Sequence, residues 1–134
     1  MKQILIVNAN YYDKISRNLI SASKKILILK KTRVKIFNVT GVFEIPVAIK
    51  KNIKKFDAFV ALGCVIKGKT PHFDFICNAV AQGITTLNIK FHKPVVFGVL
   101  TTQTLQQAID RSGGKHGNKG DEAAMTGIKM LNII

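Results

Sequence analysis

The amino-acid sequence predicts an α/β protein in which a four-stranded parallel sheet is covered by helices on both faces. Short, nearly continuous apolar runs alternate along the chain with segments whose apolar residues recur every three or four positions. The runs are typical of strands buried on both faces, and the spaced segments are typical of amphipathic helices. Strands that alternate with helices pair in parallel through right-handed crossovers, which place helices over both faces.

Two strands and two helices are predicted in the first half of the chain. The strands cover residues 2–7, which contain a continuous apolar run, and residues 34–39. Between them a helix begins at Asp13, the expected N-cap. Its apolar residues follow a period near 3.6: Ile15, Leu19, Ala22, Ile26 and Leu29. A second helix is predicted over residues 43–55, with a carboxylate and a proline near its first turn, where both are tolerated.

The second half supplies the other two strands. Residues 57–66 form the strongest one, because nearly all are apolar and the run stops at a lysine and a glycine, and residues 94–100 form the fourth. A helix from Pro71 to about Leu87 joins them. We then expect a short helix at residues 104–111, a loop at 112–120 and a closing helix at 121–134. No repeat or linker interrupts the pattern, so one domain over residues 1–134 is expected.

Composition narrows the classes of protein that the sequence can encode. The chain has 134 residues, and 47% of them are hydrophobic, which is enough for the core of one domain. Its two cysteines lie in apolar segments, which argues against a disulfide framework or a four-ligand zinc site. The first residues lack the apolar core of a signal peptide, and no run approaches a membrane span. A soluble, cytoplasmic protein without a metal is expected.

The net charge of +14, from 21 basic and 7 acidic residues, would attract polyanions and anionic metabolites alike. Most of the basic residues fall within residues 1–60, where lysines alternate with apolar positions at helical spacing. We interpret them as the solvated faces of helices. The aromatic-rich platform of single-strand binders is missing. A basic module that binds nucleic acid nevertheless stays open as an alternative of another class.

Ligand chemistry is expected at the carboxyl ends of the predicted strands. Parallel sheets bind ligands outside those ends, at the point where the strand order reverses. Four segments follow the predicted strands: residues 8–12, 40–44, 67–72 and 101–104. They hold most of the polar and aromatic residues that the fold itself does not require. The site is therefore expected where these segments meet.

Hydroxyl and basic side chains near these ends are candidates for holding a phosphate. Thr70 precedes a predicted helix start, whose unsatisfied N–H groups stabilise an anion, and Lys69 adds a full charge. Arg111, at the end of the short helix, can clamp a phosphate through two hydrogen bonds. His72, in a first helical turn, can exchange protons near neutral pH. Each has a plainer interpretation as part of a helix cap or as an exposed side chain.

Four further residues have structural interpretations, and three of them also have a functional one. Tyr11 can stack on a planar heterocycle or pack at a rim, and Glu44 can bind ligand hydroxyls or complement a helix start. Phe97, on the pattern alone, is expected to be a core residue. Lys119 follows an expected N-cap, where a lysine is electrostatically unfavourable unless an anion binds nearby. Together the candidates indicate a site for a flat polar ring and a phosphate.

Four segments, in this order and spacing, resemble the 6,7-dimethyl-8-ribityllumazine synthase family: GVFEIP, ALGCVIKGKTPHFD, PVVFGVLTTQTLQQAIDR and GGKHGNKGDEAA. The resemblance implies a flavodoxin-like three-layer α/β/α sandwich. It also implies a transferase that condenses 5-amino-6-(D-ribitylamino)uracil with 3,4-dihydroxy-2-butanone 4-phosphate, the penultimate step of riboflavin biosynthesis, without cofactor or metal. The family assembles as a homopentamer, sometimes packed into a sixty-subunit shell, with active sites between neighbouring subunits. The resemblance leaves the size of this chain's assembly open.

By position, the resemblance assigns roles to individual residues. His72 matches the proton-transfer residue, and Arg111 joins Lys69 and Thr70 in holding the phosphate. The other substrate-binding positions are Tyr11, which stacks on the pyrimidine; Val42, Phe43 and Glu44, which contact the ribityl chain; Cys64, Val65 and Ile66, whose backbone reads the ring; Phe97, a second aromatic wall; and Lys119, a basic residue near the site. Phe97 and Arg111 would face the ligand held by the adjacent subunit.

The chain departs from the usual family pattern near the site. Tyr11 stands where phenylalanine or tryptophan is usual, Tyr12 near an expected asparagine, Lys67 where arginine is usual, and Lys69 in place of a small residue. Two alternative functions are the lumazine dismutation of archaeal-type riboflavin synthases, which share fold ancestry, and the nucleic-acid binding that the net charge suggests. No known nucleic-acid motif is present, so nucleic acid is not expected to be the primary partner.

Overall fold

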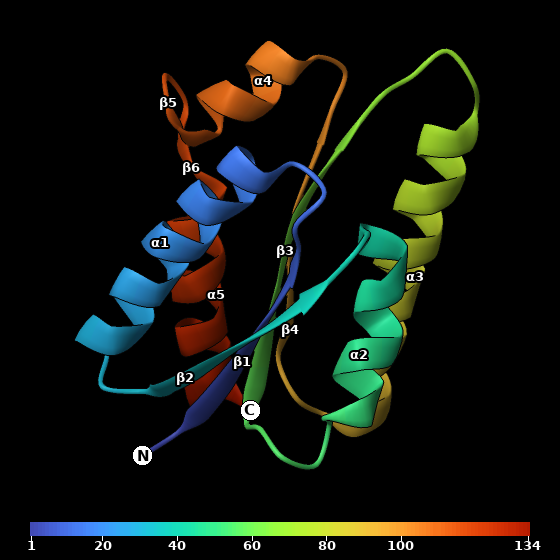
Figure 1. The fold of residues 1–134 in the computed structure, drawn as a ribbon. Helices are drawn as coiled ribbons and strands as arrows, with labels where there is room; N and C mark the ends of the chain where they lie inside the picture. Colours follow the sequence, from blue (N-terminus) through green and yellow to red (C-terminus); the bar gives the residue numbers. More distant parts are fainter.

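Four parallel strands form the central sheet of the computed structural model, which describes residues 1–134 (Figure 1). The strands are β1 (Gln3–Ala9), β2 (Arg33–Val39), β3 (Ala58–Ile66) and β4 (Val95–Thr102). Their order in the sheet is β2-β1-β3-β4, and all three pairings are parallel. The strand order therefore reverses between β1 and β3.

Helices cover both faces of this sheet, which confirms the predicted flavodoxin-like three-layer α/β/α sandwich (Figure 1). One face carries α1 (Asp13–Leu29) and α5 (Lys119–Ile133), and the other carries α2 (Ile45–Lys51) and α3 (His72–Phe91). A 3-10 turn, η1 (Val42–Glu44), precedes α2, and α4 (Leu105–Asp110) follows β4. None of the helices combines the length and apolar character needed to cross a membrane.

Alternation along the central strands fills a separate core on each side of the sheet. Leu5 and Val7 pack with α2 and α3, whereas Ile4 and Ile6 pack with α1 and α5. All four are buried, as expected for a strand covered on both faces. Because the two cores hold the strands from both sides, the carboxyl ends of the strands form a rigid base for the loops above them.

Some predicted helix boundaries differ from the structure. Asp13 is the first helical residue instead of the cap, and its carboxylate pairs with Arg17 at 2.9 Å. The helix predicted over residues 43–55 ends at Lys51, and the helix predicted to end near Leu87 continues to Phe91. These shifts reflect the weak periodicity of apolar residues near helix ends.

The segment predicted as a loop at residues 112–120 contains an antiparallel hairpin of β5 (Ser112–Gly114) and β6 (Gly117–Asn118). Gly113 and Gly117 have positive φ angles of 102° and 81°, which a residue with a side chain would rarely adopt. The closing helix starts at Lys119, two residues earlier than predicted. Asn118 is its N-cap, as expected, and its Oδ1 accepts a hydrogen bond from the Gly120 N–H at 2.8 Å.

Candidate functional site

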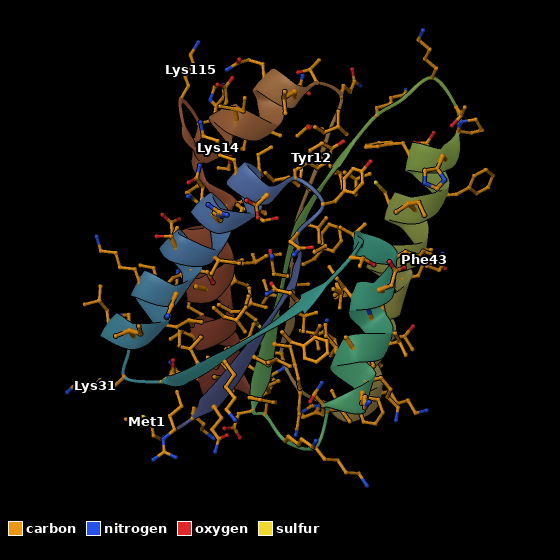
Figure 2. All side chains as sticks on the ribbon, viewed as in Figure 1. Met1, Tyr12, Lys14, Lys31, Phe43 and Lys115 are labelled. Carbon is orange, nitrogen blue, oxygen red and sulfur yellow. The ribbon has the colours of Figure 1, made fainter.

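The loops that follow β1, β2 and β3 meet where the strand order reverses. They enclose a pocket of about 540 Å³, here called the switch-point pocket. In Figure 2, the labelled residues Tyr12 and Phe43 belong to its wall and come from the β1 loop and from η1. Its lining residues are Tyr11, Tyr12, Gly41, Val42, Phe43, Glu44, Cys64, Val65, Ile66, His72 and Ile76. This pocket therefore lies at the carboxyl ends of the strands, where the ligand site is predicted.

The 3-10 turn η1 reaches the switch-point pocket because β3 has a glycine beneath it. A Cβ on Gly63 would lie 2.8 Å from Val42 Cγ1 and 3.1 Å from Ala9 Cβ. Only a residue without a side chain lets η1 lie this close to the sheet. The turn then presents Phe43 and Glu44, both exposed, at the pocket wall. The Thr40 hydroxyl donates a hydrogen bond to Glu44 Oε1 at 3.3 Å, which orients the carboxylate.

The two tyrosines after β1 form an edge-to-face pair in the same wall. Their ring centroids are 5.0 Å apart and their planes meet at 78°. Tyr11 is 75% exposed, whereas Tyr12 is half-buried. The Tyr11 ring is thus accessible, and stacking on a planar ligand stays a prediction.

His72 lies on the opposite side of this pocket, as the first residue of α3. Its backbone N–H donates a hydrogen bond to Thr70 Oγ1 at 3.4 Å, and its imidazole is exposed. Lys69 and Thr70 precede the helix on an exposed loop and line no described pocket. Lys69 and Thr70 therefore share no described pocket with the other predicted phosphate ligand, Arg111.

A second pocket of about 610 Å³, here called the edge pocket, lies beside the edge strand β4. It gathers three predicted site residues, Phe97, Arg111 and Lys119, and adds His116. Arg111 Nη1 donates a hydrogen bond to the Gln107 carbonyl oxygen at 3.0 Å, so its guanidinium folds back over α4. The positive charges of Arg111 and Lys119 outnumber the single carboxylate of this pocket, Glu122, and this balance favours an anionic ligand.

The two pockets share no lining residue. The switch-point pocket holds three aromatic residues and Glu44, whereas the edge pocket holds Arg111 and Lys119 beside one carboxylate, Glu122. Phe97, expected from its pattern to be a core residue, is only half-buried because β4 is an edge strand. Sequence reasoning did not assign Tyr12 or His116 to a pocket, although both lie within segments that it marked as loops. No group of three or more His, Cys, Asp or Glu side chains is arranged to hold a metal ion.

Burial raises the pKa of the Cys64 thiol from its ordinary 9.0 to about 11. Burial also raises the pKa of the Tyr12 phenol, with smaller contributions from Cys64 and Tyr11. Both groups are therefore neutral at physiological pH. A neutral thiol is a poor nucleophile, so covalent catalysis by Cys64 is not expected.

We expect alkylation of Cys64 by iodoacetamide to rise with pH around a midpoint near 11, because only the thiolate reacts and burial disfavours it. The measurement is the rate of alkylation by mass spectrometry between pH 7 and 11 in a Cys77→Ser background, with N-acetylcysteine as the control. Rapid alkylation of Cys64 at pH 8, at the rate of the free thiol, would contradict this prediction.

Comparison with known proteins agrees with this geometry. Residues 1–134 match the family model described as 6,7-dimethyl-8-ribityllumazine synthase. A 6,7-dimethyl-8-ribityllumazine synthase from Cytophaga hutchinsonii is 51% identical over 134 residues, covering 94% of this chain and 82% of the relative. One from Parabacteroides distasonis is 50% identical over 107 residues, covering 78% of this chain and 67% of the relative. The chain therefore belongs to the 6,7-dimethyl-8-ribityllumazine synthase family.

Proposed function

We propose that this chain condenses 5-amino-6-(D-ribitylamino)uracil with 3,4-dihydroxy-2-butanone 4-phosphate. The products are 6,7-dimethyl-8-ribityllumazine, phosphate and water, and the reaction is the penultimate step of riboflavin biosynthesis. Family membership supports this assignment. The structural observation that carries it is a pair of pockets, one lined by aromatic residues and Glu44 and the other with a net positive lining from Arg111, Lys119 and Glu122.

The switch-point pocket suits the pyrimidine. Tyr11 would stack on its ring, and Glu44 would accept hydrogen bonds from the ribityl hydroxyls, with Val42 and Phe43 along the chain. The strand end at residues 64–66 has backbone groups that can read the polar edge of the ring. The substrate amine is itself the nucleophile, so the protein's main contribution is to position two reactants, which can supply a very large effective molarity.

The second reactant needs a cationic site for its phosphate and a group that moves protons. His72 would transfer protons during imine formation and phosphate elimination. Thr70 and Lys69 lie two and three residues before it in the sequence, and the Thr70 hydroxyl accepts a hydrogen bond from the His72 N–H. Arg111 and Lys119 would stabilise the departing phosphate through charged hydrogen bonds, with Phe97 as a second wall.

We infer that the complete active site forms between two copies of the chain. Phe97 and Arg111 line a pocket that shares no residue with the switch-point pocket of the same chain. A head-to-tail arrangement of copies would bring the edge pocket of one subunit to the switch-point pocket of the next, and such contacts close into rings. The assembly proposed is therefore a homopentamer or a larger oligomer built from it.

Subunit mixing tests this arrangement. Arg111→Ala lacks one half of the site, and a Glu44→Ala, His72→Ala double variant lacks the other. Each alone is expected to form lumazine slowly, whereas oligomers refolded from an equal mixture should regain about a quarter of wild-type activity, because about one contact in four pairs two intact halves. The product is followed by its absorption spectrum.

Two results would contradict the proposals separately. If mixing restores no activity although mixed oligomers form, the site is not shared between subunits. If the wild-type chain yields no lumazine from the two substrates, the proposed reaction itself is wrong.

A further inference from the structure

We propose that Tyr12 is a positioning residue that fixes the ring of Tyr11 and so sets the affinity for the pyrimidine substrate. The inference rests on the proposed function, since it concerns the wall on which that substrate would stack. Tyr12 is labelled in Figure 2, at the start of α1 above the carboxyl ends of the strands.

The backbone around this tyrosine pair is firmly held. The Ser16 hydroxyl donates a hydrogen bond to the Ala9 carbonyl oxygen at 2.8 Å, and the Ser16 N–H donates to the Tyr12 carbonyl oxygen at 2.9 Å. The Asn10 N–H donates to the Val39 carbonyl oxygen at 3.2 Å. Both ends of the short loop are thus fixed to the sheet and to α1. The position of the Tyr11 backbone is therefore set, and its side-chain rotamer is what can still vary.

The Tyr12 side chain is anchored, whereas that of Tyr11 is not. The Tyr12 ring packs against the core between the sheet and α1, close to Cys64. Tyr11 is 75% exposed, and its hydroxyl makes no side-chain hydrogen bond in the structure. The aromatic contact of Tyr11 is the edge-to-face pair with Tyr12, at 5.0 Å and 78°. The half-buried ring therefore restricts the orientation of the exposed one.

Restriction of an exposed ring matters for ligand binding. A stacking wall that is already oriented loses less rotamer freedom when the pyrimidine binds. Edge-to-face pairs are worth enough to change a binding constant by about 2-fold to 10-fold. The contribution comes from the aromatic ring of Tyr12, and its hydroxyl makes no hydrogen bond that the position of Tyr11 needs. Phenylalanine should therefore replace Tyr12 without loss.

Steady-state kinetics with both substrates test the proposal. Tyr12→Leu is expected to raise the KM for the pyrimidine about 3-fold to 10-fold. Its kcat and its KM for the butanone phosphate should match the wild type, and Tyr12→Phe should match it in all three. If Tyr12 acts through Tyr11, then Tyr12→Leu should have no further effect on the pyrimidine KM in a Tyr11→Ala background.

Three results would overturn the inference. The first is a Tyr12→Leu variant with an unchanged pyrimidine KM. The second is a Tyr12→Phe variant as impaired as Tyr12→Leu, which would assign the effect to the hydroxyl. The third is an additive effect in the Tyr11→Ala background. Tyr12→Met, which keeps an apolar side chain of similar length, replaces Tyr12→Leu if circular dichroism shows that the latter is unfolded. A wild-type chain without condensation activity would refute the proposed function instead.

Discussion

Replacement of Arg111 by alanine is expected to lower kcat/KM about 100-fold to 1000-fold, the cost of removing one preorganised donor to a developing anion. The replacement should harm turnover more than His72→Ala does. Both side chains are exposed, but under the proposed function water can take over part of the proton transfer of His72, whereas it cannot supply the positive charge that Arg111 would place on the leaving phosphate. The measurement is steady-state formation of the lumazine with both substrates varied.

Two variants sharpen the interpretation of Arg111→Ala. Arg111→Lys keeps the positive charge but loses the bidentate hydrogen bonds of the guanidinium, so an intermediate decrease in kcat/KM is expected. Lys115→Ala removes a nearby cation that lines neither pocket and, as Figure 2 shows, extends from the hairpin away from the sheet. It should leave kcat/KM within about twofold of the wild type. A His72→Ala variant more impaired than Arg111→Ala would overturn this division of roles.

Replacement of Gly120 by alanine is expected to lower the free energy of unfolding by at least about 3 kcal/mol, near the upper end for overpacking. A methyl group there would collide with the backbone carbonyl oxygen of Leu19 in α1 and lie 2.9 Å from Asn118 Oδ1. A backbone oxygen within the helix α1 cannot turn aside as a flexible side chain can. The first turn of α5 would have to move away from α1.

Gly127→Ala in the same helix is the matched control for Gly120→Ala. A methyl group on Gly127 would lie 3.6 Å from Val96 Cγ2 and 3.8 Å from Val60 Cγ2, which are ordinary contacts. Because alanine favours a helix over glycine, this variant should be unchanged or up to about 1 kcal/mol more stable. Urea denaturation at one fixed protomer concentration measures both variants. Equal midpoints for the two variants would show that the α1–α5 contact can adapt.

The sequence was sufficient to predict the sheet because its strands are short apolar runs and its helices carry clear periodicity. The edge hairpin of β5 and β6 escaped prediction, since segments of three and two residues are too short to show a period. The start of α5 was placed at Asp121 from its acidic first turn, although the expected cap at Asn118 already pointed to Lys119. At that boundary the N-cap residue was a better guide to the helix start than the acidic residues of the first turn.

The sequence pattern of a strand does not show where that strand lies in the sheet or which helices pack beside it, and this limited prediction of the candidate site. Phe97 has the pattern of a core residue, and nothing in its neighbours reveals that β4 lies at the edge of the sheet. Tyr12 follows Tyr11 in a loop already marked as functional, but its half-buried position depends on the packing of α1 against the sheet. His116 joins Arg111 and Lys119 only because the hairpin folds back towards β4.

The separation of the switch-point pocket from the edge pocket has a consequence for the cell. Under the proposed assembly, a newly made polypeptide is idle until it meets others of its kind. At low abundance, the rate of vitamin synthesis would then rise more steeply than the concentration of the polypeptide, because that concentration also sets the fraction that is assembled. Dilution of the purified protein should likewise abolish its activity at concentrations where each polypeptide is still folded.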